Sequence, residues 1–254
     1  KVHVTNSIAE TNHNLCLFFG VTYQEYLDSL SGQIDEVVLH QNLIGSDGWK
    51  SFEELFKILN ATAKYVVLRN FEKFFDEIIC DEHLDIDLLV SNYNEVRLIS
   101  NSIEVYPHNS RVVNQVIIDG ELVNFDFRSI YDNYMDSKWS SDIIENRVLD
   151  IRGFYKPNKK HYFYSLMYHA LLHKSEISND YIKRLKLLGS ELGVSKSKLD
   201  SRGSLVKTLS NYLKANELKI VEPNDVSVFY NSSDYNQKIS VSRKLMTIFY
   251  LARY

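Results

Sequence analysis

One short acidic segment constrains the fold and the chemistry of this chain more than any other feature. Residues 84–90 read Leu84-Asp85-Ile86-Asp87-Leu88-Leu89-Val90. The alternation of large apolar residues is typical of a β-strand, in which successive side chains point to opposite faces. Asp85 and Asp87 therefore project from the same side of the predicted strand.

The segments around this strand predict a mixture of helices and strands. Residues 52–61 have apolar residues at helical spacing behind Ser51-Phe52-Glu53-Glu54, the pattern of a capping box. Residues 65–69 resemble a buried strand, and residues 71–78 a short helix. Residues 112–118 and 121–128 predict a hairpin, because Asp119-Gly120 between them favours a tight two-residue turn.

The pattern changes to helices after about residue 140. We predict helices at 161–174, 180–193 and 203–215, and an extended piece at 225–230. The predicted fold class is α+β: a mixed sheet flanked by helices in residues 1–150, with its core at 51–130, followed by a mainly helical domain in residues 151–254. The first 50 residues, which include a strand-like run at 36–40, have no evident role.

Composition excludes several classes of protein. No apolar run approaches the roughly 20 residues that span a bilayer. The net charge of −4 lacks the basic excess that drives binding to duplex DNA. Only two cysteines, Cys16 and Cys80, are present, which indicates a reducing, cytoplasmic location. The chain starts at Lys1 rather than Met, which indicates a piece of a longer protein with further domains.

Two aspartates one residue apart on a strand are suited to hold a hard cation through carboxylate oxygens, as Mg²⁺ or Mn²⁺ prefers. Such a cation bridges phosphate oxygens during phosphoryl transfer, and a third carboxylate commonly binds or deprotonates the attacking hydroxyl. Asp126, on the second hairpin strand with Arg128 two residues on, is the candidate for that role. The alternative is that Asp-x-Asp occurs by chance and that these carboxylates are solvated on an exposed face.

The order of these elements resembles the polymerase-β-like nucleotidyltransferase superfamily, including a little-described bacterial and viral group within it. The resemblance covers about residues 51–130. It depends on three elements: Tyr65-Val66-Val67-Leu68-Arg69-Asn70-Phe71-Glu72, Leu84-Asp85-Ile86-Asp87-Leu88-Leu89-Val90, and Asp126.

The resemblance implies that Asp85, Asp87 and Asp126 form the acidic triad and ligate magnesium. It also implies that the turn after the first strand binds the phosphates of the donor. The family usually has Gly-Ser or Gly-Gly in this turn, where the present chain has Arg69-Asn70. Asn70 can donate through its amide, and Arg69 can pair with phosphate in a bidentate manner or form a surface ion pair.

The predicted helix at 161–174 carries His169 and His173 four residues apart, so both imidazoles share a face. We predict that His169, His173, Lys174 and Arg128 contribute to donor binding. Zinc binding by this pair is an alternative that lacks a third ligand, and partly buried structural histidines are another. Cys80 and His83 offer only half of a zinc-binding spacing.

The leading hypothesis is a magnesium-dependent transferase. It would move a nucleotidyl or phosphate-linked group from a nucleotide-activated donor to a hydroxyl acceptor. The resemblance implies that the acceptor is a glycan and that the transfer belongs to surface-polysaccharide synthesis. Two alternatives remain: a non-catalytic nucleotide-binding or interaction module with a degenerate fold, and a glycoside hydrolase that uses two of the aspartates.

Overall fold

The computed structural model describes residues 4–30, 42–71, 85–106, 112–231, 233–235 and 239–251. The described residues form an α+β structure with a five-stranded mixed sheet, as the sequence predicts. Three predictions lie wholly or mostly outside these residues: the strand at 36–40, the helix at 71–78, and the pairing of Cys80 with His83.

The central sheet has the strand order β1-β2-β5-β4-β3. β2 and β5 are parallel, and every other neighbouring pair is antiparallel. The strands are β1 (Tyr65–Val67), β2 (Ile86–Val90), β3 (Ile103–Glu104), β4 (Val113–Ile118) and β5 (Glu121–Ser129). Because β1 runs antiparallel to β2, the end of β1 lies beside the beginning of β2, and residues 68–71, which directly follow β1, lie near Asp87.

The hairpin of β4 and β5 is confirmed. Asp119 and Gly120 have φ angles of 51° and 80°, the left-handed conformations that a type I′ turn requires. Ile118 and Glu121 are paired across the turn. This register places Asp126 opposite Val113, well inside the sheet rather than at its edge.

Helices on the amino-terminal side begin at side-chain caps. α3 (Phe52–Thr62) is confirmed, and Ser51 accepts a hydrogen bond from the Glu54 amide. The Glu54 carboxylate accepts from the Lys50 amide at 2.8 Å, whereas in a capping box it would accept from the amide of Ser51, the N-cap residue. The other helices of this part are α1 (Ile8–Phe19), α2 (Tyr23–Ser29), α4 (Tyr93–Ile99) and α5 (Ser137–Glu145).

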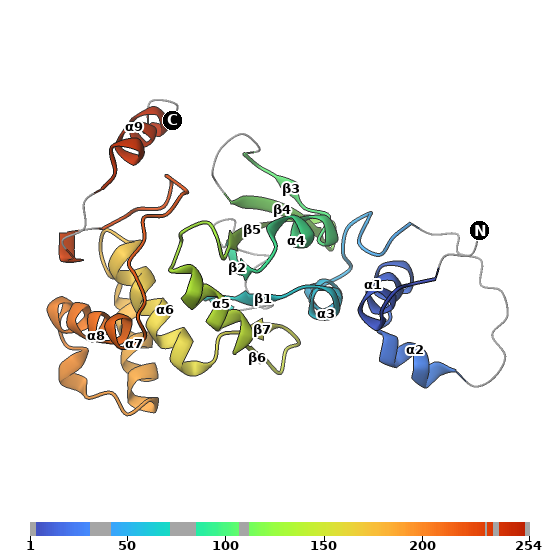
Figure 1. Cartoon of the computed structure of the whole chain (residues 1–254), viewed down its shortest axis with the longest axis horizontal. Coiled ribbons are helices and arrows are strands. Elements are labelled where there is room, and N and C mark those ends of the chain that lie inside the picture. Colours follow the sequence, from blue (N-terminus) through green and yellow to red (C-terminus); the bar gives the residue numbers. More distant parts are fainter. Residues whose placement is uncertain are drawn as a thin grey trace.

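The first helices dock onto α3. Asn12 of α1 donates to the Ala61 carbonyl at 2.9 Å and accepts from the Tyr23 amide at 2.7 Å. In Figure 1, α1 and α2 lie at one end of the molecule, the sheet lies in the middle, and α6 to α9 lie at the other end.

The carboxyl-terminal part is mainly helical, as predicted. Predicted helices 161–174, 180–193 and 203–215 correspond to α6 (Lys159–Leu172), α7 (Asn179–Glu191) and α8 (Arg202–Ala215). A short 3-10 segment, η2 (Lys196–Lys198), lies between α7 and α8, and a second one, η3 (Ser233–Tyr235), and α9 (Val241–Leu251) follow α8. None of the helices in the described ranges is long and apolar enough to cross a membrane.

The predicted extended piece at 225–230 is wrong. Residues 225–230 contain a turn and have no strand assignment. Asp225 causes this conformation, because its carboxylate accepts hydrogen bonds from the Ser227 amide and hydroxyl at 2.9 and 2.6 Å. Such side-chain contacts two residues ahead favour a turn over an extended strand.

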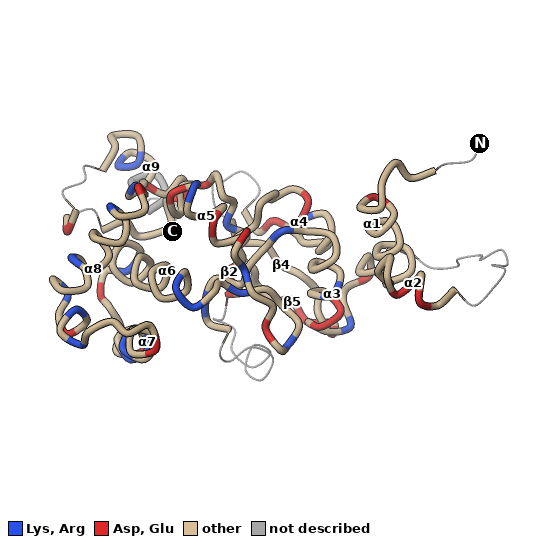
Figure 2. Tube along the Cα trace, turned by 60° about the horizontal axis from the view of Figure 1, so that its bottom comes forward, with Lys and Arg blue, Asp and Glu red and all other residues tan. Residues whose placement is uncertain are grey.

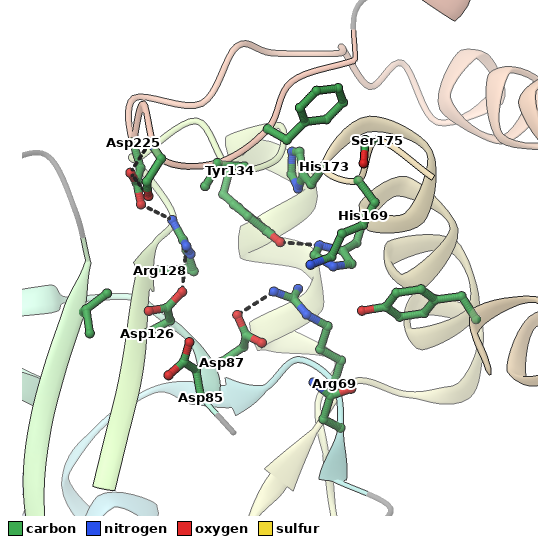
Figure 3. A pocket seen from close by; sticks show the side chains of 17 residues that line it. Arg69, Asp85, Asp87, Asp126, Arg128, Tyr134, His169, His173, Ser175 and Asp225 are labelled. Carbon is green, nitrogen blue, oxygen red and sulfur yellow. Dashed lines mark hydrogen bonds and ion pairs between the residues drawn. The ribbon is translucent and has the colours of Figure 1, made fainter. Parts of the chain in front are cut away.

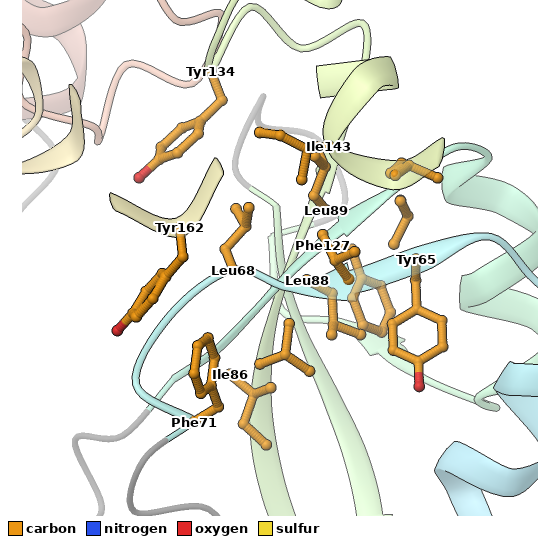
Figure 4. Packing of buried hydrophobic residues seen from close by; sticks show 14 of the residues in the cluster. Tyr65, Leu68, Phe71, Ile86, Leu88, Leu89, Phe127, Tyr134, Ile143 and Tyr162 are labelled. Carbon is orange, nitrogen blue, oxygen red and sulfur yellow. The ribbon is translucent and has the colours of Figure 1, made fainter. Parts of the chain in front are cut away.

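One hydrophobic core continues from the sheet into the helical part, across the domain boundary predicted near residue 150. β2 is buried on both faces, so Leu89 is enclosed although it lies on the same face as the aspartates. Figure 4 shows Leu89 of β2 beside Ile143 of α5, and Phe71 beside Tyr162 of α6, within this one cluster. The sheet and α6 therefore hold each other in place, which fixes the residues that α6 directs at the sheet.

A small hairpin of β6 (Val148–Leu149) and β7 (Tyr155–Lys156) is stabilised by the buried carboxylate of Asp150. This carboxylate accepts from Arg152 Nε at 2.7 Å and from Lys156 Nζ at 2.6 Å. Hydrogen bonds from Arg152, followed by those from Lys156, outweigh burial and hold the pKa of Asp150 below its usual value. Arg152 also donates to the Phe71 carbonyl at 2.6 Å, which ties the hairpin to the turn after β1.

We expect Asp150→Asn to lower the free energy of unfolding by about 2 kcal/mol at pH 7, because two cations lose their buried counter-ion. A lowered folded-state pKa means that the stabilisation is present above about pH 4 and is lost as pH falls further. Urea unfolding at several pH values measures the difference. Asp200→Asn, in an exposed pair 3.9 Å from Lys186, is the control and should leave stability unchanged. A difference that does not shrink in acid would contradict the assigned cause.

Candidate active site

A pocket of about 510 Å³ lies between the sheet and the end of α6. All nine residues proposed from the sequence line it: Arg69, Asn70, Asp85, Asp87, Asp126, Arg128, His169, His173 and Lys174. Figure 3 shows the three aspartates on one side of the pocket and the two histidines on the other. Residues up to 105 positions apart in the sequence therefore meet at one place.

The acidic side of the pocket is built by the parallel pair β2 and β5. Asp87 and Asp126 are Cα partners in this pair, so their side chains stand next to each other on one face. Neighbouring strands are about 4.8 Å apart, which is within the reach of two carboxylates that share one cation. Asp85 immediately precedes β2 and is exposed, whereas Asp87 is buried.

Two buried arginines are paired with these carboxylates. Arg69 donates to Asp87 Oδ1 at 2.5 Å, and Arg128 donates to Asp126 Oδ2 at 2.7 Å. Arg128 also donates to Asp225 Oδ2 at 3.0 Å. The second oxygen of Asp126, Oδ1, is buried and has no hydrogen-bond partner among the described residues. An unbonded carboxylate oxygen in a buried site is a ready acceptor for a cation or a proton.

The crowding of charge raises the pKa of Asp87. Burial is the largest cause, the positive charge of Arg69 opposes it, and the negative charges of Asp126 and Asp85 add to it, so that the pKa is raised to about 6. Burial, the largest effect, lowers the pKa of Arg69, but Asp87, Tyr134 and Tyr181 together outweigh it, so that this pKa is raised. The negative charges of the carboxylates therefore repel one another, and a bound cation would reduce this repulsion.

The turn after β1 contains a backbone conformation that is uncommon for residues other than glycine. Asn70 has φ of 61°, and asparagine tolerates this left-handed region better than most residues. Its side-chain oxygen accepts from Arg184 of α7 at 3.2 Å. Arg184, in the basic run of residues 183–186, thus supports this turn.

Tyr134 connects the two arginines to α6. Its ring lies 5.5 Å from the Arg69 guanidinium carbon and 4.7 Å from that of Arg128, both in cation–π geometry. Its hydroxyl is hydrogen bonded to His169 Nδ1 at 2.6 Å. Tyr134 therefore holds both guanidinium groups and one imidazole in fixed relative positions.

The two histidines of α6 are buried with unsatisfied nitrogens. His169 Nε2 and both ring nitrogens of His173 have no hydrogen-bond partner among the described residues. Burial, and next the positive charge of Arg69, lower the pKa of both imidazoles well below its usual value. Both rings are neutral at neutral pH, so each offers a donor and an acceptor. Buried polar atoms are rarely left unbonded, which indicates that a ligand or water completes these contacts.

Several lining residues were not anticipated from the sequence: Val113, Tyr134, Ser175, Tyr181, Asp225, Ser227, Val228 and Phe229. Asp225 is the most consequential of them. It lies 97 positions after Arg128 in the sequence, and it accepts a hydrogen bond from the same guanidinium that Asp126 does. The only sequence signal was the Asp-x-Ser spacing, which predicts a local turn and says nothing of its distant partner.

The described residues contain no group of three Asp, Glu, His or Cys side chains placed to hold a metal ion. Asp87 and Asp126 are each directed at an arginine, and His169 is directed at Tyr134. His169 and His173 have their ring centroids 5.8 Å apart. The described residues therefore provide no third ligand for a zinc ion bound by His169 and His173.

Comparison of the chain with models of protein families, with curated proteins and with solved structures finds no match.

Proposed function

We propose that this pocket binds a divalent cation, Mg²⁺ or Mn²⁺, together with a nucleotide. We propose further that the protein transfers a nucleotidyl or phosphate-linked group from a nucleotide-activated donor to a hydroxyl acceptor. The observation that carries the proposal is the convergence of Asp87 and Asp126 in register on adjacent strands, with Asp85 beside them and an unbonded Asp126 oxygen. The order of the helices and strands adds support through the resemblance described above, from which the Arg69-Asn70 turn departs.

The donor set suits a hard cation, since Asp85, Asp87 and Asp126 provide only oxygen ligands. A cation held there would neutralise negative charge on the phosphate oxygens of the donor. Its entry requires that Arg69 leave Asp87, because that contact occupies an oxygen of the acid. The released guanidinium would then be free to pair with phosphate, for which its two parallel N–H groups are suited.

Four carboxylates and three cationic side chains line the pocket, which leaves it close to neutral before any ligand enters: Arg69, Asp85, Asp87, Asp126, Arg128, Lys174 and Asp225. A divalent cation would make the pocket positive. Phosphate binding would restore the balance, so the cation and the nucleotide should each favour entry of the other.

Asp126 is the proposed base. The hydroxyl oxygen of the acceptor forms a new bond to phosphorus as the bond from phosphorus to the leaving phosphate breaks. Asp126 Oδ1 takes the hydroxyl proton, because this oxygen is buried and unbonded. His173, Lys174 and Ser175 at the end of α6 line the opposite side of the pocket, where the rest of the donor or a glycan acceptor would lie.

A second candidate is a nucleotide-binding or interaction module without turnover. The observation that favours it is the close contact of Arg69 with Asp87, at a turn where the resembled family has small residues. If this contact is permanent, Asp87 is unavailable to a cation. Metal binding therefore separates the two candidates.

Isothermal titration calorimetry with nucleoside triphosphates and CDP-linked donors, with and without magnesium, tests the proposal. Wild-type protein should bind at least one of these ligands about tenfold more tightly with magnesium, a difference of about 1.4 kcal/mol. Asp85→Asn combined with Asp87→Asn should abolish this increase, because amides are weak ligands for a hard cation. Magnesium-independent binding that the double variant leaves unchanged would contradict the proposal and favour the second candidate.

A further inference from the structure

A second pocket, of about 570 Å³, lies in the helical part of the chain and shares no lining residue with the candidate active site. It is formed by the start of α6, by η2 and by α8. The lining residues on which the argument depends are Lys160, Tyr164, Lys198, Lys207, Thr208 and Tyr212. Lys160 and His173 are 13 positions apart on or at the end of α6, which corresponds to about 20 Å.

The charge of this second pocket is unusual. Three lysines line it, Lys160, Lys198 and Lys207, and no Asp or Glu is among the lining residues. None of these lysines has an ion-pair partner in the part of the chain that the structure describes, whereas the adjacent Lys159 pairs with Glu191 at 2.9 Å. Like charges that converge on one hollow repel each other and raise the local positive potential, which an anion would relieve.

The surrounding segment strengthens this potential. Residues 159–219 contain 12 Lys and Arg against 5 Asp and Glu, a net charge of +7 in a chain whose total is −4. Figure 2 shows Lys and Arg recurring along and around α8, at the end of the molecule opposite α1 and α2. Net positive charge is thus concentrated in the segment that forms the pocket, whereas the chain as a whole is net negative.

The lining of the pocket is partly aromatic. Tyr164 and Tyr212 are stacked with ring centroids 3.6 Å apart and planes 8° apart. Lys160 Nζ lies 5.7 Å from the centre of the Tyr212 ring, which restrains its ammonium group. Thr208 donates to the Lys198 carbonyl at 3.1 Å and so joins η2 to α8. These contacts join the segments that carry the three lysines, and hydroxyl and amide groups lie between the lysines.

We infer that this second pocket binds a small phosphate ester that carries hydroxyl groups, such as a sugar or polyol phosphate. Ammonium groups bind phosphate as point charges, and the Ser, Thr and Asn side chains match the hydroxyls of the ligand. The volume is within the range of pockets for small molecules and is too small for a folded partner. The inference does not depend on the function proposed for the first pocket.

Calorimetry with pyrophosphate and with glycerol 3-phosphate, in EDTA, tests the inference. Wild-type protein is used, because in EDTA the ion pairs of Arg69 with Asp87 and of Arg128 with Asp126 keep the first pocket close to neutral, and metal-dependent binding there does not contribute. We expect binding at one site. The triple change Lys160→Gln, Lys198→Gln and Lys207→Gln should weaken it at least tenfold. These side chains are exposed, so the fold should be retained, which circular dichroism checks.

The matched control is Lys183→Gln, Lys214→Gln and Lys219→Gln, which removes the same charge from exposed positions of the same basic segment outside the pocket. It should change affinity by less than about threefold, as expected for screened long-range attraction. Equal losses in the two triple variants, or no binding of either probe, would overturn the inference. Binding of single-stranded oligouridylate alone would also overturn it and would indicate a nucleic-acid site instead.

Discussion

Asp126→Asn should lower the rate of group transfer by about 10²- to 10⁴-fold but weaken nucleotide binding much less, because Asp85 and Asp87 would still hold the cation. This is the size of effect expected when a general base is removed. The amide keeps the shape of the carboxylate and can still accept the hydrogen bond that Arg128 now gives to Asp126 Oδ2. It cannot take a proton at the position of Oδ1, the buried oxygen without a partner.

The measurement is transfer from labelled nucleotide donors to sugar or polyol acceptors, with donor affinity measured in parallel. Asp119→Asn is the control, because Asp119 lies at the exposed tip of the β4–β5 turn, where asparagine is equally suited. Full activity in Asp126→Asn would show that Asp126 is not the base. Equal loss of binding and of turnover would instead assign Asp126 to cation binding alone.

The parts of the fold that sequence predicted best are those fixed by local rules. The Asp119-Gly120 turn needs two residues that tolerate positive φ, so the hairpin and its register follow from the dipeptide. α3 follows from Ser51 and the apolar spacing behind it. The register of the hairpin then determines which face carries Asp126 and Arg128.

The contacts that sequence could not predict are those between distant segments. Tyr134 and Asp225 have no neighbours in the sequence that mark them as pocket residues, yet one holds both arginines and the other pairs with Arg128. Residues 225–230 also show how one side chain overrides a pattern. Their alternation favours a strand, but the hydrogen bonds of Asp225 to Ser227 form a turn. The pairing of Arg128 with Asp225, 97 positions away, depends on tertiary packing, and the periodicity of the sequence carries no information about it.

The Arg69–Asp87 pair has a consequence for stability as well as for binding. The side chains are 10% and 7% exposed, so each charge relies on the other for compensation. Breaking a buried pair by removing one partner costs about 3–5 kcal/mol, because the remaining charge is left without a counter-ion. The same carboxylate is a proposed ligand of the cation. A divalent cation and Arg69 should therefore substitute for each other as the counter-ion of Asp87.

Arg69→Met should accordingly lower the free energy of unfolding by about 3 kcal/mol in EDTA, and magnesium should restore part of this loss. Methionine keeps the length of the apolar stem and removes the guanidinium. The variant should also bind magnesium alone more tightly than wild-type protein does, while its affinity for nucleotide with magnesium falls, because the phosphate loses its proposed partner. Urea unfolding and calorimetry, each with and without magnesium, measure these effects.

Arg69→Lys is the matched control. It keeps the charge beside Asp87 and so should retain most of the stability, but a single ammonium cannot pair with phosphate through two parallel N–H groups, so nucleotide affinity should still fall. If magnesium stabilises wild-type protein and Arg69→Met equally, the cation does not take the place of Arg69 at Asp87. The pair would then be a permanent ion pair, and the protein would fit the non-catalytic module better than the transferase.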